Sequence, residues 1–209
     1  MDVLIIIDVQ NDFCPGGALA VPNGNEVIAP INTISPLFDC VIQTQDWHPS
    51  DHFSFASNHP EKLPYDTIEL KYGEQILWPD HCVQGTVGAE FHPSLNTLKT
   101  QFIIRKGFRK TIDSYSVFNE NDKRTSTGLC GLLDELDAQR IFLAGLATDF
   151  CVKWSALDAA KLGYETYLVT DAIRGINIDN SVAQALEEMK EAGVTFTTSK
   201  EIQDVSEQE

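Results

Sequence analysis

The stretch RIFLAGLATDFCV, Arg140 to Val152, passes from an apolar run of strand length into the start of a helix. It leaves one cysteine, Cys151, in the first helical turn. Open α/β sheets place their sites at the carboxyl ends of parallel strands, which favours a functional cysteine over a buried structural one. Unpaired N–H groups and the helix dipole stabilise a thiolate there, so we expect the pKa of Cys151 to fall below the ordinary value of about 8.5.

Short apolar runs of strand length recur on both sides of this stretch and alternate with helical patterns. The chain has 209 residues with 43% hydrophobic content, enough for one large domain over residues 1–209. Two-sided apolar strands with intervening helices predict a parallel sheet covered on both faces. The expected strands are Val3–Ile7, Cys40–Thr44, Phe102–Arg105, Ile141–Ala144, Thr166–Val169 and Thr195–Thr197, and the expected helices are Asn25–Leu37, Thr127–Leu136, Phe150–Leu162 and Ser181–Ala192.

The charge balance excludes some classes of partner. With 15 Lys and Arg against 31 Asp and Glu, the formal net charge is −16, which repels nucleic acid and anionic membranes. The N-terminus lacks a basic leader, and no apolar run approaches the roughly 18 residues of a membrane span. Five irregularly spaced cysteines indicate reduced thiols rather than a disulfide framework, so we expect a cytoplasmic protein.

A segment of little regular periodicity, about residues 45–100, contains all five histidines. Segments of this kind inside a compact domain are usually functional. Asp46 and His48 stand two residues apart at the end of an expected strand, and His81 comes from a separate loop. One carboxylate and two imidazoles suit Zn²⁺, Fe²⁺ or Mn²⁺. The alternative is a turn with a solvated histidine, and the sequence does not establish that His81 approaches the other two.

Two more charged residues close apolar strands, Asp8 after LIII and Lys106 after FIIR. Taken singly, Asp8 can cap a turn and Lys106 can be a solvated amine. Together with Cys151 they stand at one edge of the expected sheet. A carboxylate beside a thiol can accept its proton, and an ammonium favours both anions, which is the arrangement of an activated nucleophile.

These residues lie in motifs that resemble the nicotinamidases of the isochorismatase-like cysteine hydrolase family. The resemblance covers nearly the whole chain. It is carried by IIIDVQNDFCPGGALAV around Asp8, QTQDWHPSDHFSFA around Asp46 and His48, LWPDHCVQGTVGAEFHP around His81, IRKGFRKTIDSYSVF around Lys106 and GLATDFCV before and at Cys151. The resemblance implies a three-layer α/β/α fold with a doubly wound sheet of six parallel strands.

The resemblance also implies the chemistry: a Cys151, Asp8 and Lys106 triad that deamidates nicotinamide to nicotinate and ammonia through a thioester. A divalent metal, Zn before Fe or Mn, would hold the ring nitrogen of this small-molecule substrate, and pyrazinamide is a second expected substrate. The N–H groups of Ala147 and Cys151 would form the oxyanion hole, and the peptide bond from Leu146 to Ala147 is expected to be cis.

Phe13, Trp78 and Tyr115 match ring-packing positions of the family, although each can equally be core. His52 matches a position that binds metal in some relatives only, and we leave it outside the ligand set. No role is assigned to the polar insert Ser116 to Gly128, and the sequence leaves a homo-oligomer open.

Three other interpretations remain. The first is another hydrolase on the same scaffold, such as an isochorismatase or a carbamoyl-amide hydrolase, although these generally lack the Asp46, His48 and His81 set. The second is a metallohydrolase whose metal-bound water is the nucleophile, with Cys151 incidental. The third is a metal-binding protein without catalysis.

Overall fold

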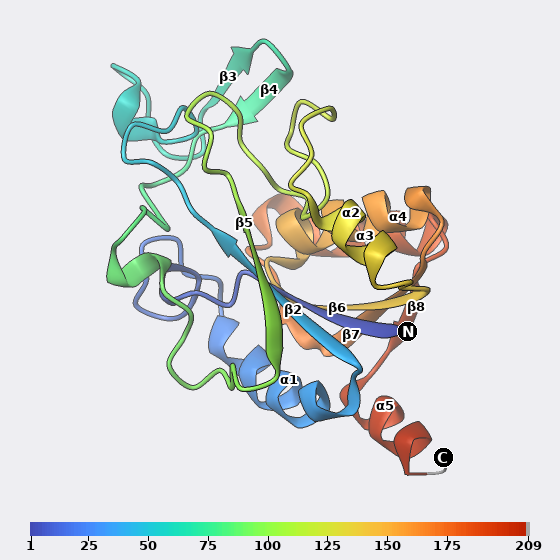
Figure 1. Cartoon of the computed structure of the whole chain (residues 1–209). Coiled ribbons are helices and arrows are strands. Elements are labelled where there is room, and N and C mark those ends of the chain that lie inside the picture. The colour runs from blue at the N-terminus through green and yellow to red at the C-terminus, as the bar shows by residue number, and fades with distance from the viewer. Residues whose placement is uncertain (208–209) are drawn as a thin grey trace.

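The computed structural model describes residues 1–207 and is built on a six-stranded parallel sheet (Figure 1). The strand order is β5-β2-β1-β6-β7-β8, so the chain starts in the middle of the sheet and extends it in both directions. Such an order is the doubly wound arrangement that the family resemblance implied. The strands are β1 Asp2–Ile7, β2 Cys40–Asp46, β5 Thr100–Lys106, β6 Arg140–Leu146, β7 Glu165–Arg174 and β8 Thr195–Thr197.

Helices cover both faces of the sheet, which makes the fold a three-layer α/β/α structure (Figure 1). In β1, Leu4 and Ile6 are buried in the cluster that includes α1. The alternate residues Val3 and Ile5 are buried in the other cluster, with residues from the three helices that lie between positions 129 and 191. The period of two along a strand therefore divides the core into two layers. One face carries α1 Ile28–Ile34 and α5 Ser199–Ser206, and the other carries α2 Leu129–Glu135, α3 Lys153–Leu162 and α4 Ser181–Glu191.

The helices differ from the sequence prediction mainly at their ends. The expected helix over residues 25–37 is α-helical only in α1, with 3₁₀ turns at Gly24–Val27 and Ser35–Leu37. Helix α3 begins after a π-helical turn, Thr148–Val152, and ends at Gly163 with φ of 94°. Helix α5 was not predicted, although Thr198 and Glu201 form a capping box at its start.

The segment over residues 45–100 contains a small antiparallel hairpin that the sequence analysis missed. Strands β3 Thr67–Leu70 and β4 Gly73–Ile76 pair with each other outside the main sheet, at one end of the molecule (Figure 1). The expectation of an irregular segment was therefore wrong for these residues.

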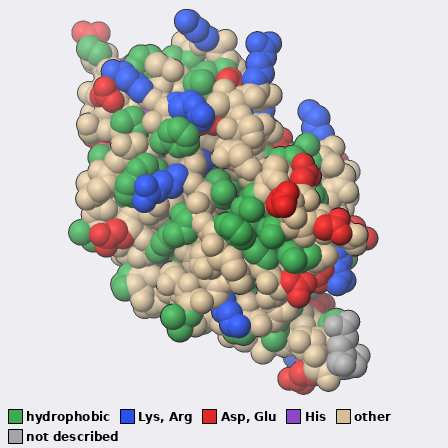
Figure 2. All heavy atoms as spheres, in the orientation of Figure 1, with side chains coloured by type: hydrophobic (Ala, Val, Ile, Leu, Met, Phe, Trp, Pro, Cys, Tyr) green, Lys and Arg blue, Asp and Glu red, His purple; other side chains and the backbone are tan. Residues whose placement is uncertain are grey.

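The edge strand β5 also departs from the expectation that both faces of the sheet are covered. The side chains of Phe102 and Ile103 are 38% and 53% exposed. Figure 2 shows hydrophobic side chains among charged ones on the face of the molecule on which β5 lies.

No helix within residues 1–207 is long and apolar enough to cross a membrane. All five cysteines carry free thiols.

Candidate active site

Three strand ends bring the candidate triad together at the carboxyl edge of the sheet. Lys106 is the last residue of β5, and its Nζ lies 2.9 Å from Oδ2 of Asp8 and 3.4 Å from Sγ of Cys151. The same ammonium donates to the carbonyl oxygen of Ser114 at 2.8 Å. Asp8 and Lys106 are fully buried, and Cys151 is 6% exposed. The alternatives of a turn cap and a solvated amine do not describe these two charged residues.

Asp8 follows β1 in a left-handed backbone conformation, with φ of 49°. Such a φ is uncommon outside glycine, and residues that adopt it cluster at functional sites. The hydroxyl of Thr44, in the adjacent strand β2, donates to Oδ1 of Asp8 at 2.7 Å. This bond leaves Oδ2 facing the ammonium.

The expected pKa of Cys151 is wrong. Burial raises the pKa of this thiol well above its ordinary value, Asp8 and Asp46 raise it further, and Lys106 only partly opposes them. The prediction considered the helix N-terminus alone, whereas the enclosed position of Sγ withholds water from a thiolate. The resting side chain is therefore a thiol that needs a proton acceptor.

The pKa of Asp8 suits that acceptor role. Burial raises it above the ordinary carboxyl value, Lys106 lowers it and Asp46 raises it again, with a net upward shift. A base works best when its pKa lies near the operating pH. The shift therefore makes Asp8 a better proton acceptor than an exposed aspartate.

Asp46, His48 and His81 form a second buried cluster whose ligand atoms lie within 4.8 Å of one another. Oδ2 of Asp46 is 3.5 Å from Nε2 of His48 and 3.9 Å from Nε2 of His81. The Nδ1 atoms face carbonyl oxygens, that of Gly107 at 2.7 Å from His48 and that of Pro79 at 2.8 Å from His81. A carbonyl only accepts, so Nδ1 carries the proton and the lone pair of Nε2 is left for a metal.

The pKa values of the two imidazoles shift in opposite directions. Burial lowers the pKa of His81 to about 4, so this ring is neutral near pH 7. Burial alone would lower the pKa of His48, but the carboxylate of Asp46 outweighs it and raises the value. One carboxylate with two buried imidazoles is a donor set that fits Zn²⁺, Fe²⁺ or Mn²⁺.

His52 is buried beside this cluster, with its ring centroid 4.3 Å from that of His48. Its Nδ1 accepts from the N–H of Ser54 at 3.2 Å and lies 2.7 Å from the Ser54 hydroxyl oxygen. Its Nε2 donates to the carbonyl of Ile112 at 3.2 Å. Both nitrogens therefore contact protein groups, although ligand atoms of His48, His52 and Asp113 also lie within 4.8 Å of one another. That His52 stays outside the ligand set remains a prediction.

A pocket reaches Cys151 between these two clusters, and the three expected aromatic residues Phe13, Trp78 and Tyr115 all line it. Nε1 of Trp78 donates to the Tyr115 hydroxyl at 3.2 Å. The pocket thus offers aromatic walls beside a thiol, as a flat ring substrate requires. Its other lining residues are Leu19, Asp46, His81, Asp113, Ala147, Phe150, Cys151 and Ile176.

Sequence reasoning missed four residues of this pocket: Leu19, Asp113, Phe150 and Ile176. Phe150 directly precedes Cys151, and its ring packs edge-on against Trp78 at 4.9 Å between centroids. Its position beside Cys151 was a usable signal. Asp113 is a buried carboxylate two residues before Tyr115, whereas Ile176 follows β7 with no motif to mark it.

Ala147 lies at the end of β6 and lines the pocket. The peptide bond from Leu146 to Ala147 is cis, as expected. The carbonyl of Ala147 accepts from the N–H groups of Phe150 and Val152, each at 3.1 Å. These bonds hold the turn on which Cys151 stands.

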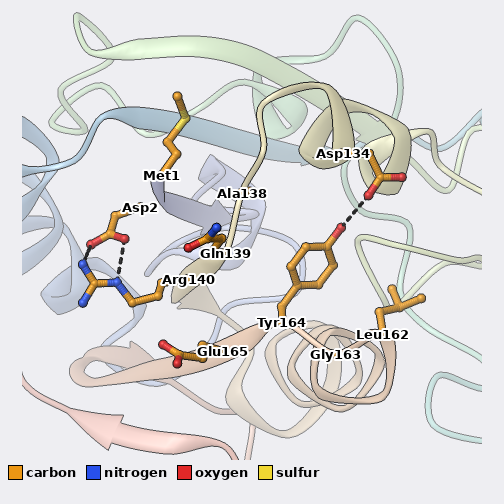
Figure 3. Close-up of a pocket in the computed structure, with 10 residues that line it drawn as sticks. All are labelled: Met1, Asp2, Asp134, Ala138, Gln139, Arg140, Leu162, Gly163, Tyr164 and Glu165. Atoms are coloured by element: carbon orange, nitrogen blue, oxygen red, sulfur yellow. Dashed lines mark hydrogen bonds and ion pairs between the residues drawn. The ribbon is translucent and has the colours of Figure 1, made fainter.

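Another pocket lies at the opposite, amino-terminal edge of the sheet (Figure 3). Arg140 there donates to Asp2 at 2.7 Å, and the Tyr164 hydroxyl donates to Asp134 at 3.4 Å (Figure 3). Arg140 and Tyr164 stand at or just before the starts of β6 and β7, whereas Cys151 follows the carboxyl end of β6. Both buried clusters of candidate functional residues lie instead at the carboxyl edge of the sheet.

Comparisons with known proteins show to which family this chain belongs. Residues 2–201 match the family model described as "Isochorismatase domain". The nicotinamidase of Acinetobacter baylyi is 51% identical over 199 residues, which cover 95% of this chain and 93% of that protein.

Two solved structures are similar as well. The nicotinamidase and pyrazinamidase of Acinetobacter baumanii has a TM-score of 0.95 at 51% identity, covering 96% of this chain and 97% of that one. The pyrazinamidase of Pyrococcus horikoshii, in complex with zinc, has a TM-score of 0.76 at 35% identity, covering 94% and 98%. The resemblance seen in the sequence motifs is confirmed, and the chain belongs to the isochorismatase family.

Proposed function

We propose that this protein is a nicotinamidase, which hydrolyses the carboxamide of nicotinamide to nicotinate and ammonia and also accepts pyrazinamide. The observation that carries the proposal is the contact of one buried ammonium, Lys106, with both Asp8 and Cys151, beside an aromatic pocket. The activities named for similar proteins from two Acinetobacter species support it.

The first step is attack on the amide. Asp8 accepts the proton of the Cys151 thiol, and the sulfur forms a bond to the carboxamide carbon while the carbonyl π pair moves onto oxygen. The N–H groups of Ala147 and Cys151 would stabilise that oxyanion, at about 3–4 kcal/mol for one such donor. Lys106 lowers the cost of the buried negative charge that moves between Cys151 and Asp8.

The second step releases the products. The protonated Asp8 gives its proton to the departing nitrogen, and the C–N bond breaks to leave ammonia and a thioester on Cys151. Asp8 then takes a proton from water, which attacks the thioester carbon. The C–S bond breaks, Asp8 returns its proton to the Cys151 sulfur, and the product leaves as nicotinic acid, which ionises to nicotinate in water.

Asp46, His48 and His81 would hold a divalent cation, for which zinc is the first candidate and iron or manganese the others. The zinc complex of the similar Pyrococcus protein supports a metal here. When bound, the cation supplies a ligand position for the ring nitrogen of the substrate, which orients the carboxamide toward Cys151. Phe13, Trp78 and Tyr115 pack against the ring.

The test is ammonia release from nicotinamide by the wild-type protein, Cys151→Ala and a control, Cys130→Ala. Cys130 is partly buried, and its Sγ contacts the Tyr164 hydroxyl at 3.9 Å, outside the pocket. We expect wild type and the control to release ammonia and Cys151→Ala to lose at least about 10³-fold in kcat.

Two outcomes would overturn the proposal. A Cys151→Ala variant with most of the activity would indicate that metal-bound water is the nucleophile. A metal-loaded, reduced wild type that releases no ammonia would favour another substrate on this scaffold or a non-catalytic protein.

A further inference from the structure

The β3–β4 hairpin contacts the pocket wall through two side chains, those of Gln75 and Tyr72. Of its strand residues, all of which are described, Gln75 alone is buried, at 1% exposure. Its neighbour Glu74 is exposed. A hairpin of this size is marginal by itself, so its place on the molecule depends on such tertiary contacts.

Every polar atom of the Gln75 side chain has a partner. Nε2 donates to Oδ2 of Asp113 at 2.8 Å and to the carbonyl of Ile76 at 2.7 Å. The Tyr72 hydroxyl donates to Oε1 at 2.9 Å and accepts from the backbone N–H of Asp113 at 3.3 Å. Gln75 and Tyr72 thus hold Asp113 by its carboxylate and by its backbone. The bond to the carboxylate is charge-assisted, which makes it the strong member of the set.

Asp113 begins a run of three residues, 113–115, that face the reacting groups. Oδ1 of Asp113 accepts from the N–H of Ser114 at 2.8 Å, and the Ser114 carbonyl accepts from Nζ of Lys106 at 2.8 Å. Asp113 and Tyr115 line the same pocket as Cys151. Nε2 of Gln75 also lies 3.4 Å from the Tyr115 hydroxyl, to which Trp78 donates.

We propose that Gln75 is a positioning residue, which links the β3–β4 hairpin to residues 113–115 through its hydrogen bond to Asp113. This link fixes the wall of the substrate pocket and the Ser114 carbonyl that accepts from Lys106. This role deepens the proposed function and rests on it. Gln75 acts only through other residues, because it is absent from the pocket lining. Its loss affects substrate binding more than the chemical step, because Lys106 keeps Asp8, Asp46 and Cys151 as partners.

The test compares Gln75→Ala with Glu74→Ala, an adjacent change on the same strand that leaves the hydrogen bond between Gln75 and Asp113 intact. Two measurements are made on metal-loaded protein: steady-state kinetics with nicotinamide, and hydrogen–deuterium exchange without substrate. The amides of residues 113–115 are suitable probes, since they donate to Tyr72, Asp113 and Asn121 respectively.

For Gln75→Ala we expect KM to rise about tenfold, kcat to fall by less than KM rises, and the amides of residues 113–115 to exchange faster. Glu74→Ala is expected to match wild type in all three. Should Gln75→Ala fail to fold, Gln75→Met keeps the side-chain volume and gives the same comparison.

If the amides of residues 113–115 exchange in Gln75→Ala as they do in wild type, Gln75 does not order this segment and the proposal is wrong. Faster exchange with an unchanged KM, or a fall in kcat alone, would overturn the positioning role. A wild type that releases no ammonia defeats the proposed function instead, and the exchange comparison still decides whether Gln75 orders this segment.

Discussion

Asp46 and Lys106 join the candidate triad to the candidate metal site through one carboxylate. Oδ1 of Asp46 lies 2.6 Å from Nζ of Lys106, whereas Oδ2 faces the two imidazoles. The same ammonium lies 2.9 Å from Asp8. One buried ammonium is therefore shared by two buried carboxyl groups, and neither site is electrostatically independent of the other.

Removal of that charge is expected to destabilise the fold. Lys106→Met leaves two carboxylates without their buried counter-ion, which costs about 3–5 kcal/mol when one partner of a buried pair is lost. Urea unfolding of metal-free protein measures the change. Lys110→Met is the control, because its pair with Asp51 is exposed and is expected to contribute little. Equal free energies of unfolding for the two variants would show that the fold does not need Lys106 as the counter-ion of Asp8 and Asp46.

Asp8→Asn is expected to remove most of the activity and to change its pH dependence. Burial raises the pKa of Asp8, and the base must be ionised, so kcat/KM of wild type falls as the pH drops through a value above the ordinary 3.8. Without the base we expect a loss of about 10²–10⁴-fold and no acid limb from this group. A pH–rate profile of both proteins decides the point, and an unshifted acid limb in Asp8→Asn would assign it to another residue.

Asp8→Asn is not expected to lower the free energy of unfolding, whereas Asp46→Asn is. A group with a raised folded pKa contributes stability at low pH and loses it as the pH rises through that pKa, so ionised Asp8 costs stability near pH 7. For Asp46, burial acts upward, but Lys106 and His48 lower the pKa below 3.8. Its contribution is present above pH 3.8 and is lost as the pH falls.

Unfolding of metal-free Asp8→Asn and Asp46→Asn at pH 7 tests this difference. Asp8→Asn should be at least as stable as wild type and Asp46→Asn less stable. The reverse order would mean that Asp8, not Asp46, is the main partner of Lys106.

The sequence alone was sufficient for the six strands and for the residues at their ends. Buried strands have continuous apolar runs, and in a parallel sheet their carboxyl ends meet at one edge. Asp8, Lys106 and Cys151 could therefore be placed together before any distance was known. His81 was harder, because its approach to Asp46 depends on the path of a loop, and the motif resemblance supplied what periodicity did not.

Other features depend on tertiary structure that no local pattern encodes. Strand β3, TIEL, alternates over only four residues, and β4, GEQI, has one apolar residue, while Lys71 and Tyr72 between them are not typical turn residues. The pKa of Cys151 was predicted from its helix end, but burial by the surrounding elements decides its direction. Gln75 and Asp113 gain their importance only from each other, 38 positions apart.

Gly107→Ala is expected to weaken metal binding. Gly107 has φ of +64°, and a Cβ built on it would overlap Cε1 and Nδ1 of the His48 ring. Its carbonyl also accepts from that ring. Displacing the ring moves Nε2 away from Asp46, and disturbed support of a ligand typically costs 10–100-fold in affinity, or about 1.4–2.7 kcal/mol. Zinc titration against a competing chelator measures it. Gly131→Ala, in α2 with open space around it, should bind as wild type does.

His81→Gln and His52→Gln separate a ligand from a neighbour of ligands. His81 presents a free Nε2 toward Asp46, so its replacement removes one of three donors, and we expect the purified variant to lose its metal on dialysis. His52 uses both nitrogens within the protein, and glutamine can keep one of those bonds, so we expect metal content equal to that of wild type. Elemental analysis of the two variants after identical metal loading measures both contents. If His52→Gln loses the metal and His81→Gln keeps it, His52 is the ligand and His81 is not. The ring of His52 would then have to turn away from Ile112 in the loaded protein.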